Sequence, residues 1–135
     1  MNSPTPKKIL FVCIGNSCRS QMAEGFARHL GGDSLLVFSA GSRPAGFVAD
    51  GAVRAMQEVG IDISKQASKS VEEFRGQEFD AVVTMGCGDA CPWLPAKRRY
   101  DWKIPDPIGQ SEDFFRKVRG QIEAEVRALL ADLGQ

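Results

Sequence analysis

Four stretches of the chain are apolar enough to form strands. The continuous apolar run at residues 9–13 is typical of a strand that is buried on both faces of a parallel sheet. Residues 79–85 are predicted to form another buried strand, and residues 35–39 a second short strand. Residues 61–68 carry a weaker version of the same signal and are predicted to form a further short strand. The sequence therefore predicts a four-stranded sheet.

Apolar residues at three- and four-residue spacing lie between these runs and predict helices. The first helix begins at Ser20 and ends at the pair Gly31-Gly32. The second ends at Gly60, because glycine readily adopts the left-handed conformation that follows a helix. The apolar stripe of this second helix consists of Val48, Ala52, Met56 and Val59.

The last helix follows Ser111, whose hydroxyl can cap it, and Glu112 and Asp113 place negative charge in its first turn. Its apolar face consists of Phe115, Val118, Ile122, Val126, Leu129 and Leu133. Strands that alternate with helices favour a parallel sheet with right-handed crossovers. We therefore predict an α/β fold, a three-layer sandwich in which helices flank a four-stranded parallel sheet, as one domain over residues 1–135.

Two segments lack a regular pattern. Residues 1–7 contain two prolines and are expected to form a loose N-terminal tail. Residues 93–110 contain further prolines and both tryptophans, and we expect them to form an irregular rim around the functional site. The apolar run after the tail is too short for the core of a signal peptide or for a membrane span. These features favour a cytoplasmic protein.

The charge balance argues against a general attraction to polyanions. Seventeen lysine and arginine residues match seventeen aspartate and glutamate residues, so the formal net charge is zero. We therefore expect no nucleic acid or membrane partner, and any anion site must be built locally. Four cysteines in a cytoplasmic chain stay reduced and indicate catalysis, redox chemistry or metal binding. We expect the protein to act as a monomer.

Cys13 and Arg19 bracket five residues between a predicted strand and a predicted helix. Backbone N–H groups in such a turn can cradle a tetrahedral oxyanion, and a guanidinium fork can hold two of its oxygens. The helix dipole and Arg19 favour the thiolate of Cys13, which we predict to be the nucleophile, and the Ser20 hydroxyl can donate to its sulfur. The predicted substrate-binding residues are Ile14, Gly15, Asn16, Ser17, Cys18 and Arg19. The Cys18 side chain is expected to pack in the core and to be inert.

The segment from Cys13 to Glu24, CIGNSCRSQMAE, resembles the anion loop of the low-molecular-weight tyrosine phosphatase fold and, within it, of the thioredoxin-coupled arsenate reductases. Residues 39–41, 82–84 and 106–107 are similar to the same family. Gln21 is similar to the reductases, since the phosphatases usually have proline at that position. The resemblance implies a reductase that binds arsenate in the loop, with phosphate or sulfate as other possible occupants, and that uses no cofactor.

Cys87 and Cys91 favour reduction over hydrolysis, because the phosphatases need only one thiol. A thiolate can form a thioarsenate, but arsenite leaves only when a second thiol attacks the first sulfur. The resemblance implies a disulfide between Cys13 and Cys87, then one between Cys87 and Cys91 that thioredoxin reduces. Gly86 and Gly88 would give this relay loop its flexibility. The two relay cysteines are closer together here than is typical of the reductases, and Gly86 separates Cys87 from the strand.

The resemblance also assigns Asp106 as the general acid that protonates the departing hydroxide. A turn is the alternative reading of the Asp106-Pro107 pair. In some members a potassium ion is bound by residues that match Asn16, Glu24 and Ser39, together with an aspartate. Lys69 stands at the position of that aspartate, so we expect no potassium ion and expect the Lys69 ammonium group to replace its charge.

The sequence leaves open two other functions and one variant of the reductase mechanism. The protein could be a low-molecular-weight tyrosine phosphatase, or a binding module that senses an oxyanion or a redox state without turnover. A low-molecular-weight thiol could take the place of Cys91 in the reductase. Cys87 and Cys91 have a spacing that short zinc loops tolerate, but no further cysteine pair or histidine completes a zinc site. We therefore expect no metal.

Overall fold

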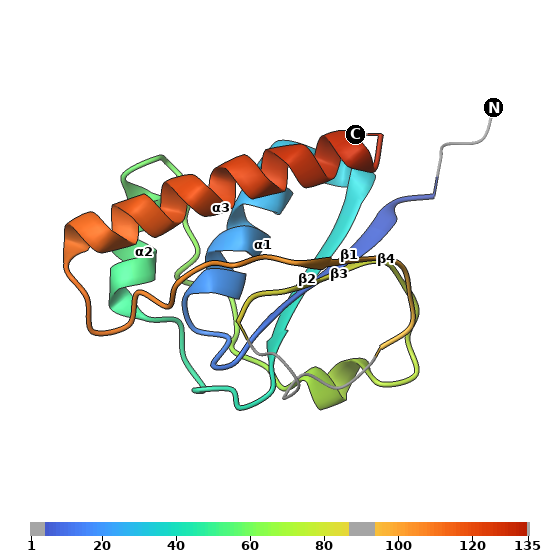
Figure 1. Ribbon diagram of the computed structural model, residues 1–135, viewed down its shortest axis with the longest axis horizontal. Coiled ribbons are helices and arrows are strands. Elements are labelled where there is room, and N and C mark those ends of the chain that lie inside the picture. The colour runs from blue at the N-terminus through green and yellow to red at the C-terminus, as the bar shows by residue number, and fades with distance from the viewer. Residues whose placement is uncertain (1–4, 87–93, 135) are drawn as a thin grey trace.

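The computed structural model describes residues 5–86 and 94–134. In chain order the elements are β1 (Lys7–Cys13), α1 (Arg19–Gly31), the 3-10 helix η1 (Gly32–Ser34), β2 (Leu35–Gly41), α2 (Asp50–Gln57), the 3-10 helix η2 (Val71–Phe74), β3 (Phe79–Thr84), β4 (Ala96–Asp101) and α3 (Glu112–Asp132). Within these ranges helices separate β1, β2 and β3, whereas β4 is the next described element after β3 and is followed by a helix (Figure 1).

The four strands form one parallel sheet in the order β2-β1-β3-β4. Cys13 at the end of β1 pairs with Gly41 at the end of β2, and Val12 pairs with Thr84 at the end of β3. The carboxyl ends of the strands therefore meet at one edge, where ligands bind in open α/β sheets. The predicted four-stranded parallel sheet is confirmed.

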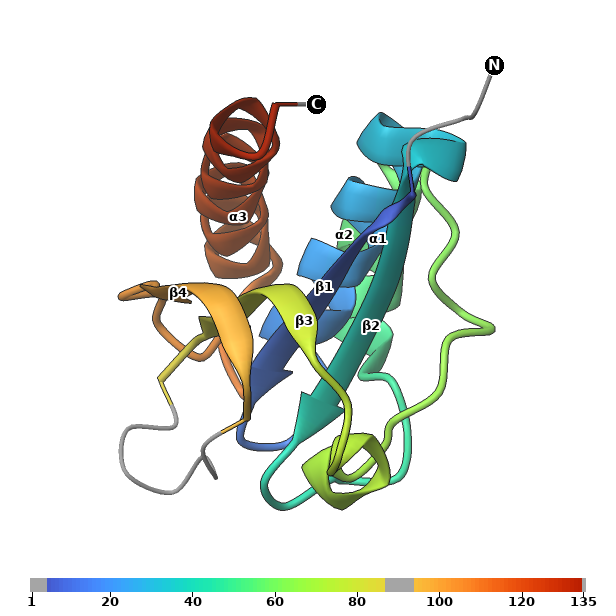
Figure 2. The same cartoon turned by 90° about the vertical axis from the view of Figure 1, so that its right-hand side faces the viewer.

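The two faces of the sheet are covered differently (Figure 2). Ile9, Phe11 and Val83 point to one face and share a hydrophobic core with side chains of α1, α2 and α3. Leu10 and Val12 point to the other face, where a smaller core includes residues of the 3-10 helix η2. The sheet thus lies between a thick layer of three α-helices and a thin layer that contains η2, which agrees with the predicted sandwich.

The fourth strand is not where the sequence predicted it. Residues 61–68 form no strand, because Ile61 and Ile63 pack into the helical core, and the nearby link to the sheet is a single bridge between Ser70 and Gly41. The fourth strand is β4, inside the segment that was predicted to be irregular. Its central side chains are exposed and basic, so it carries no apolar signal, and main-chain pairing with β3 holds it at the sheet edge.

Two element boundaries also differ from the prediction. Strand β1 begins at Lys7, so the last residue assigned to the tail belongs to the sheet; residues 1–4 lie outside the described residues. Helix α2 ends at Gln57, and Val59, predicted to lie on its apolar stripe, is 41% exposed. Ala52 and Met56 from the same stripe are fully buried.

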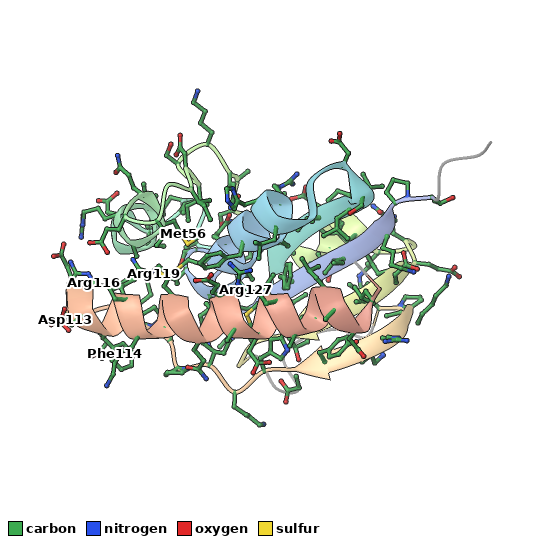
Figure 3. All side chains as sticks on the ribbon, turned by 90° about the horizontal axis from the view of Figure 1, so that it is seen from above. Met56, Asp113, Phe114, Arg116, Arg119 and Arg127 are labelled. Carbon is green, nitrogen blue, oxygen red and sulfur yellow. The ribbon has the colours of Figure 1, made fainter. Side chains whose placement is uncertain are left out.

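An ion-pair network joins the end of α2 to the start of α3. Arg116 and Arg119 extend from α3 (Figure 3). Their guanidinium groups lie 2.8 Å from the two carboxylate oxygens of Glu58. Hydrogen bonds from these two arginines lower the pKa of Glu58 to about 2. Because the groups lie at the surface, the network is sensitive to salt and its contribution to stability is small.

No helix within residues 5–86 and 94–134 has the length and apolar character needed to cross a bilayer.

Helix α3 should depend on the predicted cap. Ser111 is its N-cap residue, and its Oγ accepts a hydrogen bond from the N–H group of Phe114 at 3.2 Å. We expect Ser111→Ala to lower the free energy of unfolding by about 1 kcal/mol, because that N–H group loses its partner. Ser111→Thr should retain most of the stability. Urea unfolding of the three proteins tests this, and equal stability of the alanine and serine forms would contradict it.

Candidate active site

The anion loop, residues 14–18, connects the carboxyl end of β1 to the amino end of α1. Cys13 is the last residue of β1 and Arg19 is the first residue of α1, so strand and helix fix the two predicted key side chains directly. Cys13 is 2% exposed and Arg19 is 5% exposed. The loop therefore holds a thiol and a guanidinium group in a largely buried setting at the ligand-binding edge of the sheet.

The Cys13 sulfur has two hydrogen-bonding neighbours. The N–H group of Asn16 donates to Sγ at 3.2 Å, and the Ser20 Oγ lies 2.9 Å from it. Asn16 Nδ2 also donates to Ser20 Oγ at 2.8 Å. Because Ser20 Oγ already accepts a hydrogen bond from Asn16 Nδ2, its own hydroxyl proton is available for the sulfur. Both neighbours can thus donate to a thiolate, as predicted for Ser20.

Asn16 shapes the loop by adopting an unusual backbone conformation. Its φ is 47°, and no other non-glycine residue in the described ranges has a positive φ. Asparagine tolerates this left-handed conformation better than most residues. Gln21 Nε2 donates to the Asn16 carbonyl at 2.9 Å, and the Lys69 N–H group donates to Asn16 Oδ1 at 2.8 Å. Asn16 therefore holds the loop in place with both its backbone and its side chain.

A second segment, residues 42–49, lies behind the anion loop and binds its carbonyl oxygens. The N–H groups of Ser42, Arg43, Ala45 and Ala49 donate to the carbonyls of residues 13, 14, 15 and 17. Gly41 starts this segment close to the loop, since a Cβ on it would lie 2.5 Å from the carbonyl oxygen of Ile14. Within each trans peptide unit the C=O and N–H groups point in opposite directions, so binding the carbonyls on this side favours N–H groups that face an anion on the other.

Arg19 connects the loop to the rim. Its Nη1 donates to the carbonyl oxygen of Ile104 at 3.0 Å, and its Nη2 lies 3.8 Å from the carboxylate of Asp106. The Asp106 side chain is 54% exposed, and its Oδ1 accepts a hydrogen bond from the N–H group of Ile108 at 3.1 Å. The structure therefore brings together four predicted residues: Cys13, Arg19, Ser20 and Asp106.

The second cysteine of the loop lies in the core, as predicted. Cys18 is 2% exposed and packs with the helical side of the sheet. Burial raises its pKa to about 12, and the negative charges of Asp106 and Cys13 act in the same direction. Cys18 therefore remains a neutral thiol at physiological pH and is a poor nucleophile.

The relay cysteines Cys87 and Cys91 lie outside the described residues, as does Trp93. Gly86 is the last described residue before them and lies next to Arg19, because a Cβ on Gly86 would approach Arg19 Nη1 to 2.3 Å. Of the described cysteines, Cys13 and Cys18 are both free thiols.

The residues that match the potassium ligands have other partners here. Glu24 is buried, accepts a hydrogen bond from Ser39 Oγ at 2.5 Å and forms an ion pair with Arg28 at 2.8 Å. Lys69 Nζ donates instead to the carbonyl oxygen of Ala67. The expectation that the Lys69 ammonium group replaces the ion is therefore wrong, since Arg28 carries the charge that neutralises Glu24. In the described part of the chain no three His, Cys, Asp or Glu side chains are close enough to hold a metal.

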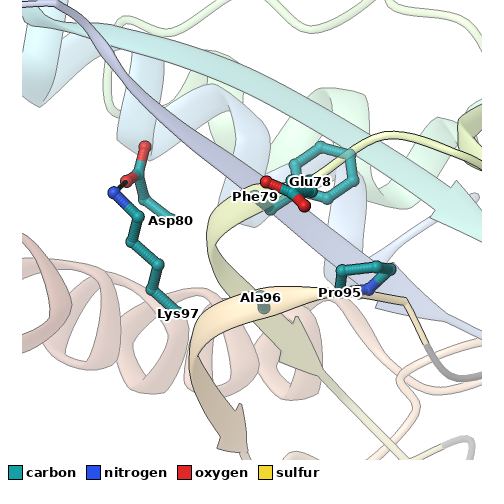
Figure 4. Close-up of a pocket in the computed structure, with 6 residues that line it drawn as sticks. All are labelled: Glu78, Phe79, Asp80, Pro95, Ala96 and Lys97. Carbon is teal, nitrogen blue, oxygen red and sulfur yellow. Dashed lines mark ion pairs between the residues drawn. The ribbon is translucent and has the colours of Figure 1, made fainter.

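A separate cavity of about 390 Å³ lies at the opposite end of the sheet (Figure 4). It is lined by residues 78–80 of β3 and the segment before it, and by residues 95–97 of β4 and the segment before it. The Asp80 carboxylate there accepts a hydrogen bond from the Lys8 N–H group and pairs with Lys97. Of the two carboxylates that line this cavity, Glu78 and Asp80, the second is already engaged, and the lining residues include no thiol, so the cavity offers less chemistry than the anion loop.

Sequence analysis missed three contributors to the anion loop and its rim. Gln21 was noted only as a family marker, yet it is fully buried and donates to both Asn16 and Ala67. The Ile104 carbonyl was missed because a backbone group leaves no signal in the sequence. The close approach of Gly41 was also missed, although a glycine directly after a buried strand indicates such crowding.

Comparison with known proteins identifies the family. The model of the low molecular weight phosphotyrosine protein phosphatase family matches residues 8–135, and the chain belongs to this family. Within it, the chain is 45% identical to the glutaredoxin arsenate reductase of Synechocystis sp., over 94% of this chain and 98% of that protein. It is 44% identical to an arsenate reductase of Halalkalibacterium halodurans, over 90% and 93% of the two chains.

Solved structures give the same result. A structure of an arsenate reductase in the phosphate binding state superimposes with a TM-score of 0.86 at 46% identity, covering 93% of this chain and 98% of that one. A thioredoxin-dependent arsenate reductase of Corynebacterium glutamicum has a TM-score of 0.79 at 34% identity, covering 100% of this chain and 66% of that one. The predicted family and fold are confirmed.

The different settings of Cys13 and Cys18 should be visible in their reactivity. We expect iodoacetamide at neutral pH to label Cys13 and to leave Cys18 unmodified, because the high pKa of Cys18 keeps it protonated. The experiment uses a Cys87→Ser/Cys91→Ser protein, and peptide mass spectrometry locates the label. Phosphate should slow the labelling of Cys13. Comparable labelling of the two cysteines would contradict the assignment.

Gln21 should support both stability and anion binding. Methionine has a similar size but no N–H group, so Gln21→Met would leave the carbonyls of Asn16 and Ala67 without this donor. We expect a loss of about 1–3 kcal/mol in the free energy of unfolding, because the Asn16 carbonyl loses this donor while the Ala67 carbonyl keeps that of Lys69 Nζ, and we expect weaker phosphate binding. Gln57→Met, at an exposed position of α2, is the control and should change neither property. Urea unfolding and calorimetry measure both.

Proposed function

We propose that this protein is an arsenate reductase that converts arsenate to arsenite. The observation that carries the proposal is the placement of the Cys13 sulfur beside two donors, the Asn16 N–H group and the Ser20 hydroxyl, at the base of the anion loop. The relatives support the choice of reaction, because proteins named arsenate reductase are 41–45% identical to this chain over most of its length.

The proposed first step is attack on arsenate. The Cys13 thiolate forms a bond to arsenic, and one oxygen leaves as water after Asp106 donates a proton. Arg19 and the N–H groups of residues 14–18 hold the remaining oxygens and stabilise their negative charge. Asp106 is suited to the acid role because its side chain lies at the rim, 3.8 Å from the group that binds the oxyanion.

The proposed second step is reduction. The Cys87 thiolate attacks the sulfur of Cys13, the electron pair of the sulfur–arsenic bond passes to arsenic, and arsenite leaves as the As(III) product. The two sulfur atoms are oxidised to a disulfide, which balances the two electrons that arsenic gains. Cys91 then attacks Cys87, which frees Cys13 and leaves a disulfide between Cys87 and Cys91.

We propose thioredoxin as the reductant of this last disulfide. The names of the relatives point to two redoxins, glutaredoxin for the Synechocystis protein and thioredoxin for the Corynebacterium protein. Thioredoxin suits the proposed relay, because a dithiol reductant opens an intramolecular disulfide by exchange. The relay also requires a compartment that keeps thiols reduced, so we propose a cytoplasmic location. All proposed residues come from one chain, which is consistent with a monomer.

The same catalytic groups favour a second activity, the hydrolysis of phosphate monoesters. A phosphatase needs the same nucleophile, the same oxyanion cradle and an acid for the leaving group, and Cys13, Arg19 and Asp106 offer these. Hydrolysis uses none of the relay thiols. The two activities can therefore be separated by substitutions outside the anion loop.

The relay predicts a specific pattern of losses. With thioredoxin, thioredoxin reductase and NADPH, we expect sustained arsenate-dependent NADPH oxidation by the native protein. Cys13→Ser should abolish this turnover and the hydrolysis of p-nitrophenyl phosphate, because both reactions need the nucleophile. Cys87→Ser and Cys91→Ser should each abolish arsenate turnover and leave ester hydrolysis within about twofold of the native rate, since neither residue acts in it.

Two controls sharpen the result. Replacing thioredoxin by glutaredoxin and glutathione in the same assay decides between the two redoxins. Cys18→Ser tests whether any cysteine substitution is harmful, and it should support arsenate turnover because Cys18 has no part in the relay. Brisk ester hydrolysis without arsenate turnover would make the protein a phosphatase, and equal loss of hydrolysis in Cys91→Ser would contradict the relay.

A further inference from the structure

Gly86 lies directly against the guanidinium group of Arg19. A Cβ atom built on Gly86 would lie 2.3 Å from Arg19 Nη1, which is closer than non-bonded heavy atoms approach, and 3.3 Å from Cζ. The backbone that leads into Gly86 is fixed. The preceding residue, Met85, is fully buried, and its N–H group donates to the Val12 carbonyl at 2.8 Å. A side chain at position 86 would therefore displace Arg19.

The nitrogen that such a side chain would displace is already in use. Arg19 Nη1 donates to the carbonyl oxygen of Ile104 at 3.0 Å, while Nη2 faces Asp106 at 3.8 Å. Arg19 is 5% exposed, so its guanidinium group has few alternative positions. The Ile104 carbonyl binds the guanidinium group by a hydrogen bond. Gly86, in a different segment of the chain, leaves the space that this group occupies. Together they define where the guanidinium fork lies.

We infer that Gly86 is a positioning residue for oxyanion binding, because the absence of a side chain at position 86 allows the Arg19 guanidinium group to take its place beside the anion loop. The choice of arsenate as the natural oxyanion rests on the proposed function, but the contact concerns any tetrahedral oxyanion in the loop. Gly86 lies between β3 and Cys87 in the chain. Its role in placing Arg19 is additional to the flexibility that the sequence predicts for the relay loop.

Gly86→Ala tests the inference, with Gly60→Ala as a matched control. Both glycines have a φ of 80°, so alanine is strained by the same backbone conformation at either position. A Cβ on Gly60 meets no atom within 4 Å, whereas one on Gly86 meets Arg19. Any effect on anion binding that is particular to Gly86→Ala is thus due to the contact with Arg19 and not to backbone strain.

The readouts are phosphate affinity by calorimetry and the kinetics of p-nitrophenyl phosphate hydrolysis. We expect Gly86→Ala to raise the Kd of phosphate by about tenfold or more, as when a charge-assisted contact is misplaced, and to raise KM for the ester. Gly60→Ala should change neither value by more than about twofold. Phosphate affinity at the native level in a folded Gly86→Ala protein would overturn the inference.

A double substitution identifies Arg19 as the group through which Gly86 acts. Lysine lacks the Nη atoms, so in an Arg19→Lys background Gly86→Ala should cause little further loss of phosphate affinity. The same loss in both backgrounds would overturn the inference. If Gly86→Ala fails to fold, recovery of folding in the Arg19→Lys background supports the contact, and failure in both backgrounds overturns it.

Phosphate binding needs neither Cys87 nor a reductant. A protein that binds phosphate as expected but turns over no arsenate would therefore disprove the proposed function and leave the role of Gly86 intact.

Discussion

The anion loop depends on the donors that bind its carbonyl oxygens. Between Cys13 and Cys18 every carbonyl oxygen accepts a hydrogen bond, from the N–H groups of residues 42, 43, 45, 49 and 22 and from the side chain of Gln21. A loop of this size could otherwise turn some carbonyls toward the ligand and repel an anion. The pairing of Gly41 with Cys13 in the sheet places residues 42–49 where their N–H groups can bind these carbonyls. The geometry of the anion loop therefore depends on the sheet.

The same arrangement makes it possible to bury polar groups of the site. Cys13 and Arg19 are both almost completely buried, and a buried polar or charged group without partners would be costly. The Cys13 sulfur has Asn16 and Ser20 as neighbours, and the guanidinium group has the Ile104 carbonyl and the nearby Asp106 carboxylate. Each of the two groups therefore has partners before an oxyanion binds. Glu24, away from the site, is likewise buried with partners, because it pairs with Arg28 and accepts a hydrogen bond from Ser39.

Much of this could be predicted from the sequence, and the failures have physical causes. Apolar runs identified β1, β2 and β3, because the central strands β1 and β3 are largely buried and the edge strand β2 is apolar although Leu36 is exposed. The residue types and order around Cys13 identified the anion loop. Strand β4 lies at an edge with exposed basic side chains, so its main-chain pairing leaves no apolar trace. The strand predicted at residues 61–68 is absent, because the isoleucines that suggested it pack in the helical core. The contact between Gly86 and Arg19 joins distant parts of the chain, and sequence spacing cannot reveal it.

One hydrogen bond of the site has a consequence for how the protein binds an oxyanion. Arg19 and Ile104 are 85 positions apart in the chain, yet the bond between them fixes the group that is to hold the oxyanion. The segment between the two residues contains β3 and β4, and holding its ends together costs chain entropy that the packed sheet offsets. A chain that lacks this contact would carry Cys13 with its local neighbours Asn16 and Ser20, but without a fixed guanidinium group for the oxyanion. Oxyanion binding is thus a property of the whole sheet and not of the anion loop alone.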